Sequence, residues 1–147
     1  MTATITITNP ILSGMNPDPS WIWDDEFQRI VLVTSTFELV PGLPIYVSED
    51  MTCWKHVSNV IDADLARRLL IPFVDDSGGV YAPTLRRIHG KYVIACTIAR
   101  LDDRRAMEGG CTESELMRFH AAEGNFILEA DSIEGPWRGP FWIEGAE

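Results

Sequence analysis

Asn16-Pro17-Asp18-Pro19-Ser20 is the stretch that decides how this chain folds. The two prolines fix their own backbone angles and restrict the residue before each, so Asp18 is expected in a stiff, extended segment at the start of a strand. An aspartate held in this way suits work that depends on geometry, because its carboxylate samples few positions. The same pentapeptide also fits an Asx-type turn cap, so the stretch alone leaves both interpretations open.

The composition is that of one globular domain. The chain has 147 residues, of which 46% are hydrophobic and 10% aromatic, enough for a substantial core. It carries 12 basic and 22 acidic residues, a net charge of -10, which argues against nucleic acid or an anionic membrane as a partner. No run approaches the roughly 18 apolar residues of a membrane span. The first residues lack the basic and apolar segments of a secretory signal, so a cytoplasmic location is expected.

The three cysteines, Cys53, Cys96 and Cys111, are an odd number without a CxxC pair. Reduced thiols are therefore expected. Cys53 and His56 have a zinc-like spacing, but no second pair completes a tetrahedral site, so neither a metal nor another cofactor is predicted. Cys96 lies in an apolar run and is interpreted as core.

The pattern of apolar residues predicts a chain that is mostly β. Buried strands are predicted at Arg29–Ser35, Ile45–Ser48, Lys91–Thr97 and Asn125–Ala130, and Thr–Ile alternation predicts another over residues 1–8. Two helices are predicted as well. One spans Ile61–Leu70, and the other follows a capping box formed by Thr112 and Glu115 and ends near Gly124.

An internal repeat organises these strands. Asp18-Pro19-Ser20 returns 64 positions later as Ala82-Pro83-Thr84, and each copy is followed by two further strands and a tryptophan, Trp54 or Trp137. A unit of about four short strands closed by an aromatic residue is typical of a propeller blade. The alternative is an ordinary antiparallel meander in a sandwich.

The motifs, taken in order, resemble those of glycoside hydrolase family 43, especially its β-xylosidase branch. The resemblance runs from about Asn9 to Trp142 and rests on these stretches: Asn9-Pro10-Ile11-Leu12, Asn16-Pro17-Asp18-Pro19-Ser20, Thr34-Ser35-Thr36-Phe37-Glu38, Pro41-Gly42-Leu43-Pro44-Ile45-Tyr46, Ser77-Gly78-Gly79-Val80-Tyr81-Ala82-Pro83-Thr84-Leu85, Asn125-Phe126-Ile127 and Ile133-Glu134-Gly135-Pro136-Trp137. It implies an all-β, five-bladed β-propeller, of which residues 1–147 would form about two N-terminal blades. It also implies hydrolysis of xylo- or arabino-oligosaccharides with inversion, and it leaves the oligomeric state open.

The resemblance assigns roles to three residues. Asp18 matches the general base of the family, and Phe37 matches an aromatic residue that lines the sugar subsite. Core packing is the alternative for Phe37. Tyr81 stands where members of the family typically carry tryptophan, and it can still stack on a pentose ring. Leu39-Val40 replaces a more aromatic pair, so the choice between xylosides and arabinofuranosides stays open.

Inversion also needs a carboxylic acid, about 6.5–9.5 Å from the base. The resemblance implies that this glutamate, and an aspartate that tunes it, follow the second blade, and neither Glu144 nor Glu147 matches the acid motif. We therefore expect a truncated catalytic domain with very low activity of its own. A non-catalytic sugar-binding piece and a structural fragment that assembles through exposed edges are the alternatives. No cluster of calcium ligands is predicted.

Overall fold

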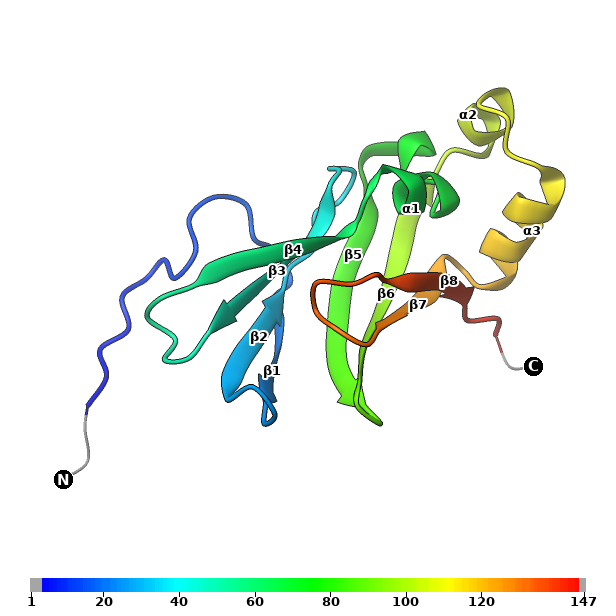
Figure 1. Ribbon diagram of the computed structural model, residues 1–147. Coiled ribbons are helices and arrows are strands. Elements are labelled where there is room, and N and C mark those ends of the chain that lie inside the picture. Colours follow the sequence, from blue (N-terminus) through cyan, green and yellow to red (C-terminus); the bar gives the residue numbers. More distant parts are fainter. Residues whose placement is uncertain (1–3, 146–147) are drawn as a thin grey trace.

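The computed structural model describes residues 4–145 and shows two four-stranded antiparallel sheets (Figure 1). The strands follow chain order in each sheet, β1-β2-β3-β4 and β5-β6-β7-β8. Their bounds are β1 Ser20–Asp24, β2 Arg29–Val33, β3 Gly42–Ser48, β4 Lys55–Ile61, β5 Val74–Ile88, β6 Lys91–Leu101, β7 Asn125–Ala130 and β8 Arg138–Trp142. This is the arrangement of two consecutive blades, so the repeat seen in the sequence is a structural repeat.

The predicted strands are confirmed where their residues are β-branched or apolar on alternate positions. In β2, Ile30 to Val33 are all buried because the strand lies between β1 and β3 and has a covered face on each side. The hairpin between β5 and β6 turns at His89 and Gly90, both with positive φ (49° and 81°). A two-residue loop with positive φ at both positions matches the twist of the flanking strands.

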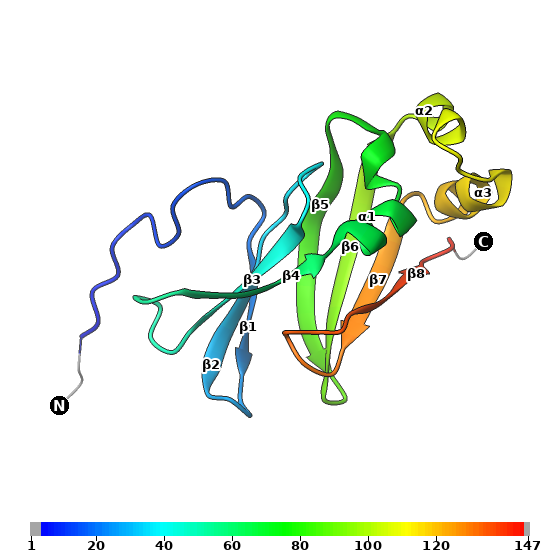
Figure 2. The same cartoon turned by 45° about the horizontal axis from the view of Figure 1, so that its top comes forward.

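The helices all lie at one edge of the molecule, which we call the helical edge (Figure 2). They are α1 Ala63–Arg68, the 3-10 turn η1 Ile71–Phe73, α2 Asp103–Glu108 and α3 Glu113–Ala121. The predicted capping box is confirmed: Thr112 accepts from the backbone N–H of Glu115, whose carboxylate accepts from Thr112. No helix within residues 4–145 combines the length and apolarity that a bilayer span requires.

Three details of the prediction are wrong. Residues 4–8 form no strand and are exposed, since nothing pairs with them, and residues 1–3 lie outside the described range. Ala82-Pro83-Thr84 does not begin a strand. It forms a bulge within β5, whose register against β6 shifts between Tyr81 and Thr84. Trp54 and Trp137 do not close the blades but directly precede the fourth strands, β4 and β8.

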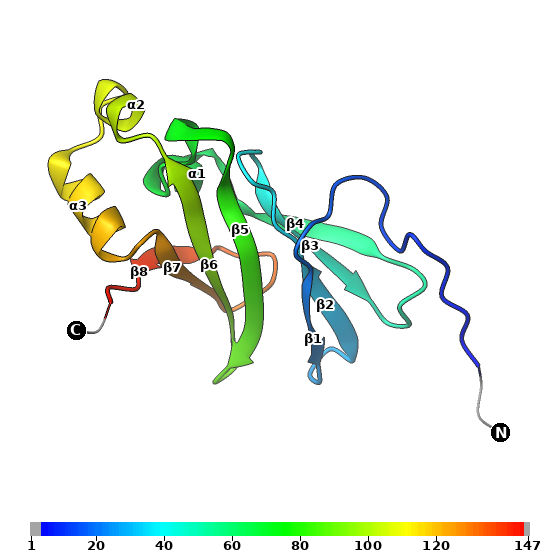
Figure 3. The ribbon, with the colours of Figure 1, turned by 180° about the vertical axis from the view of Figure 1, so that it is seen from behind.

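The two sheets pack face to face around one core (Figure 3). Val31, Val33 and Ile45 of the first sheet share this core with Leu85 and Ile94 of the second, along with Tyr92 and Leu128. β1 and β5 lie next to each other, each as the first strand of its sheet. Both begin toward the helical edge, which therefore gathers the ends of the strands that carry the motifs.

Candidate active site

Asp18 lies just before β1 and is held by Ser35, two residues after the end of β2. Its φ is 49°, so the predicted extended conformation is wrong, although aspartate tolerates this left-handed region better than most residues. The hydroxyl of Ser35 donates to Asp18 Oδ2 at 2.7 Å, and the Ser35 backbone N–H donates to the carbonyl of Pro17 at 2.9 Å. Ser35 is 0% exposed, whereas Asp18 is exposed. A rigid donor therefore fixes a carboxylate that faces solvent.

The turn that places Asp18 occurs once in each sheet. Ala82, the equivalent residue 64 positions later, has φ 44° and is likewise followed by proline. The backbone conformation thus belongs to the blade and is no sign of function by itself. Only the first sheet puts a carboxylate there, held by a hydroxyl 17 residues away rather than by its own turn, which is not the contact of an Asx-type cap.

Phe37 and Tyr81 meet where the two sheets touch near the helical edge. Their ring centroids are 5.1 Å apart at an interplanar angle of 76°, an edge-to-face pair. Backbone hydrogen bonds in both directions join Phe37 to Val80, at 3.2 and 2.9 Å. Gly79 permits this approach, because a Cβ there would lie 2.3 Å from the Phe37 carbonyl oxygen. Both rings stay half-buried, so the pair keeps a solvent-facing side.

Cys96 lies beneath Tyr81 and close to Asp18. Its thiol donates to the Tyr81 carbonyl at 2.9 Å. Burial, with a smaller contribution from the negative charge of Asp18, raises the pKa of the Cys96 thiol to about 12. The thiol is therefore a buried core group and not a nucleophile, as the sequence indicated. Ser35, which holds Asp18, is two residues before Phe37, so the carboxylate lies next to the segment that carries the aromatic pair.

The surface next to Asp18 is open rather than enclosed. A hollow of about 210 Å³ is lined by its neighbours Asn16 and Pro19 and by Leu32 and Thr34, but not by Asp18 itself. The structure thus brings Asp18, Phe37 and Tyr81 to the same region where the sheets meet, without closing a pocket around them. Ser35 completes this group. Sequence reasoning missed its role, because only the pairing of the strands shows which of the many hydroxyl side chains lies next to Asp18.

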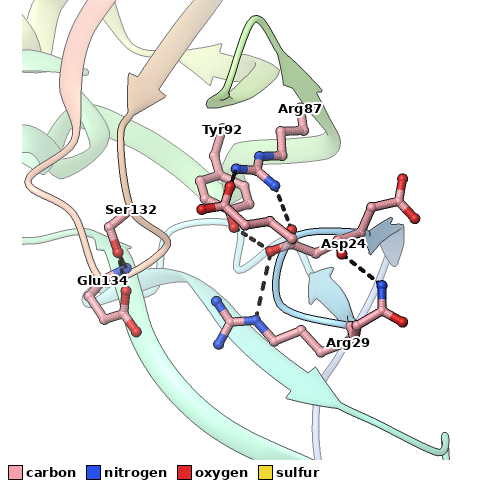
Figure 4. A network of polar contacts seen from close by, with 9 residues as sticks. Asp24, Arg29, Arg87, Tyr92, Ser132 and Glu134 are labelled. Atoms are coloured by element: carbon pink, nitrogen blue, oxygen red, sulfur yellow. Dashed lines mark hydrogen bonds and ion pairs between the residues drawn. The ribbon is translucent and has the colours of Figure 1, made fainter.

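A second polar cluster occupies the opposite end of β1, where Asp24 is 0% exposed (Figure 4). Arg87 donates from Nη1 to Asp24 Oδ1 at 2.7 Å, and the hydroxyl of Tyr92 donates to Oδ2. Arg29 Nε lies 3.7 Å from the same Oδ2, and Arg87 also pairs with Glu26. The hydrogen bond from Arg87 to Glu26 raises the pKa of Arg87, and burial raises the pKa of Tyr92. This cluster joins the two sheets and leaves its carboxylate fully engaged.

Other candidates from the sequence do not converge. Within the described residues, no three His, Cys, Asp or Glu side chains come together as a metal site would require. Cys53 is exposed, and the ring of His56 packs edge-on against Tyr46 at 5.4 Å. His120, on α3, pairs at the surface with Asp103 at 2.9 Å.

The two sheets repeat as the blades of a propeller do, with Asp18 and the Phe37–Tyr81 pair where they meet, and comparison with known proteins identifies the family. Residues 7–147 match the model of the glycosyl hydrolases family 43, and the chain belongs to that family. A non-reducing end alpha-L-arabinofuranosidase of Bacteroides ovatus is 36% identical over 140 residues, covering 94% of this chain and 22% of the relative. A xylan 1,3-beta-xylosidase of a Vibrio species is 34% identical over 139 residues, covering 93% and 22%.

Solved structures give the same result. GH43B of the Bacteroides ovatus xyloglucan PUL superposes with a TM-score of 0.72 at 33% identity, over 95% of this chain and 23% of that one. The xylan beta-1,4-xylosidase from Bacillus halodurans superposes with a TM-score of 0.68 at 29% identity, over 93% and 23%. The chain thus spans less than a quarter of the length of these relatives, and it shares the fold of their matching part.

Proposed function

We propose that this chain carries the general-base side of an inverting glycosidase site for xylo- or arabino-oligosaccharides. The observation that supports this best is the exposed carboxylate of Asp18, fixed by the buried Ser35 on the same side of the molecule as the Phe37–Tyr81 pair. The curated relatives named above act on arabinofuranosides or xylan. Their substrates are uncharged sugars, which a chain of net charge -10 does not repel.

In the proposed reaction, Asp18 accepts a proton from water while the water oxygen attacks the anomeric carbon. The bond to the leaving oxygen breaks, and a carboxylic acid about 6.5–9.5 Å away gives that oxygen its proton. The rigid donor Ser35 keeps one oxygen of Asp18 occupied and leaves the other for water. The resemblance places the acid in a later blade, so we propose that the 147 residues alone turn over little substrate.

Phe37 and Tyr81 are proposed to form one wall of the sugar subsite. Their half-buried rings offer apolar surface on which the C–H face of a pentose can stack. The Tyr81 hydroxyl donates to the Ser77 carbonyl, and this hydrogen bond fixes the orientation of the hydroxyl. Neither ring distinguishes a xyloside from an arabinofuranoside, so both remain in the proposal.

Sugar binding without turnover is the second candidate function. It is favoured by the same aromatic pair, which needs no acid partner to hold a pentose.

A cytoplasmic location stays a prediction; the free thiols Cys53, Cys96 and Cys111 support it.

Two measurements test the proposal. In the first, xylose and arabinose are titrated into the 147-residue chain and amide chemical shifts are followed. We expect shifts around Phe37 and Tyr81 that disappear in Phe37→Ala and persist in Asp18→Asn. Sugar-induced shifts that are unchanged in Phe37→Ala would remove the proposed subsite.

The second measurement places residues 7–145 into the Vibrio relative in place of its matching segment, so that the relative supplies the later blades. The chimera is expected to hydrolyse aryl β-xylosides, and Asp18→Asn is expected to lower kcat by about 10²–10⁴-fold, the contribution of a general base. Asp25→Asn, an exposed aspartate in the β1–β2 turn, serves as the control. Full turnover by the Asp18→Asn chimera would show that the base is assigned wrongly.

A further inference from the structure

Two hollows lie along strand β8, on the side of the second sheet that faces α1 and β4. The first, of about 290 Å³, is lined by Trp142 of β8 and Arg118 of α3, among others. The second, of about 160 Å³, is lined by Trp137, just before β8, and by Asn59 of β4. Arg68 of α1 lines both. Together they make up what we call the β8 groove, defined by Asn59, Arg68, Arg118, Trp137 and Trp142.

Hydrogen bonds tie the sides of the groove to each other. The Ser58 hydroxyl of β4 donates to the Ile133 carbonyl of the β7–β8 connection at 2.6 Å. Arg68 donates from Nη1 to the Gly139 carbonyl in the middle of β8, and from Nε to Asp64 at 3.0 Å. Arg68 therefore lies between the two hollows, and the groove is formed where the first sheet, α1 and the second sheet are joined.

Trp137 and Trp142 lie at the two ends of β8 and face the same side. Residues five apart on a regular strand point to opposite faces. The register of β8 against β7 shifts between Ile127 and Glu129, and this irregularity returns both indoles to the face that packs on the core, which each of them contacts. Both are half-buried, so each keeps surface that is open to the groove. At a rise of about 3.4 Å per residue, the strand separates them by no more than about 17 Å.

The polar side chains of the groove offer donors and acceptors with little net charge. The exposed amide of Asn59 can do both. The charge of Arg68 is compensated by Asp64, with which it forms an ion pair. The exposed Arg118 shares its hollow with the carboxylate of Glu115. Such a set suits the hydroxyl groups of a ligand, whereas a phosphate or carboxylate would need uncompensated positive charge.

We infer that the β8 groove binds a neutral oligosaccharide. Sugar rings stack on the indole at each end, and the hydroxyl groups between them meet Asn59 and Arg68. A single sugar cannot bridge the two indoles, so affinity should grow with chain length.

The β8 groove is separate from the proposed subsite at Phe37 and Tyr81. Tyr81 lies on β5, and β8 is the third strand beyond β5, roughly 14 Å away at about 4.8 Å per strand. The choice of a xylo-oligosaccharide as the occupant rests on the proposed function, whereas the groove rests on its own geometry. The two proposals can therefore fail independently.

Amide chemical shifts of the 147-residue chain, titrated with xylose and with xylohexaose, test this inference. We expect xylohexaose to shift the amides around Trp137 and Trp142 and to bind there at least about tenfold more tightly than xylose, because two platforms act together. Asn59→Ala and Arg118→Ala, both at exposed positions, should each weaken this binding about two- to tenfold, the contribution of a hydrogen bond. Trp142→Phe keeps an aromatic ring against the core but offers a smaller platform, so it should weaken binding as well. Trp21→Ala removes an exposed tryptophan outside the groove and should leave the affinity unchanged.

Phe37→Ala separates the groove from the proposed subsite. It should remove the sugar-induced shifts around Phe37 and Tyr81 and leave those along β8. If it removes the shifts along β8 too, there is one site and the inference is overturned. The inference also fails if xylohexaose shifts no amide along β8, or if its affinity is the same in Asn59→Ala, Arg118→Ala and Trp142→Phe as in the unchanged chain. Affinity that falls strongly with added salt would overturn the neutral class of the ligand. Shifts along β8 with none around Phe37 would support the groove and remove the proposed subsite.

Discussion

Replacing Asp24 by alanine is predicted to destabilise the junction between the two sheets. The change leaves the buried hydroxyl of Tyr92 without its acceptor and Arg87 without its partner inside the interface. Removing one member of a buried ion pair costs about 3–5 kcal/mol. Arg87 retains Glu26, and its side chain is 22% exposed, so we expect the lower end of that range, about 3 kcal/mol. For a domain of this size that corresponds to a fall in Tm of about 6–12 °C.

Urea unfolding followed by tryptophan fluorescence measures this loss. Asp25→Ala is the matched control, since it removes a neighbouring aspartate that is exposed, and it should change the free energy of unfolding by less than about 0.5 kcal/mol. In a double-mutant cycle with Arg87→Met, the combined loss should be smaller than the sum of the single losses, because the first change already breaks the pair. A loss below about 1 kcal/mol for Asp24→Ala, or strictly additive losses, would refute this account of the interface.

Three further predictions concern single sites. Cys53 should react with a thiol reagent in the native protein, whereas the buried Cys96, whose pKa is raised to about 12, should react only after denaturation; rapid native labelling of Cys96 would contradict its burial. Hydrogen bonds from Thr52 lower the pKa of Asp50 from 3.8 to about 2. The ionised carboxylate therefore stabilises the fold above pH 3.8, and this stabilisation is lost as the pH falls towards 2. Between these pH values the free energy of unfolding, measured from unfolding curves, should fall less in Asp50→Asn than in the wild type. Gly79→Ala should cost more than about 1 kcal/mol, because its Cβ would meet backbone atoms of the β2–β3 connection. Gly90→Ala has the same kind of positive φ (+81° against +97°) but open space around it, so it should carry the backbone strain alone and cost less than Gly79→Ala; equal losses in thermal unfolding would contradict the packing described.

The sequence predicted the elements whose signal is local. β2 and β6 are rich in β-branched or alternating apolar residues, and the Thr112–Glu115 capping box depends on residues three apart. Strands β4 and β8 escaped prediction because the first mixes polar residues into its pattern and the second contains Gly139 and Pro140, which read as loop. Each of these two strands forms because it pairs with the neighbouring strand, and a local sequence pattern carries no information about that pairing.

The candidate site was predicted less completely, because its contacts cross between strands and sheets. Asp18 could be singled out from its flanking prolines, but the hydroxyl that orients it belongs to Ser35, 17 residues away in the connection after β2. The Asp24–Arg87 pair is 63 residues apart and exists only because the two sheets stack. Such pairs follow from the packing of β1 against β5, a contact between two sheets that no local pattern in the sequence contains.

A comparison of Asp18, just before β1, with Asp24, at its end, explains why we propose the general base at one and not the other. Asp24 accepts from Arg87 and Tyr92 and lies beside Arg29, with no exposed surface, so water cannot reach a free lone pair. Asp18 accepts one hydroxyl from Ser35 and is otherwise open to solvent. A general base needs an unoccupied oxygen within reach of a water molecule. Of these two carboxylates only Asp18 meets that requirement, whereas Asp24 joins the two sheets at whose contact we propose the site.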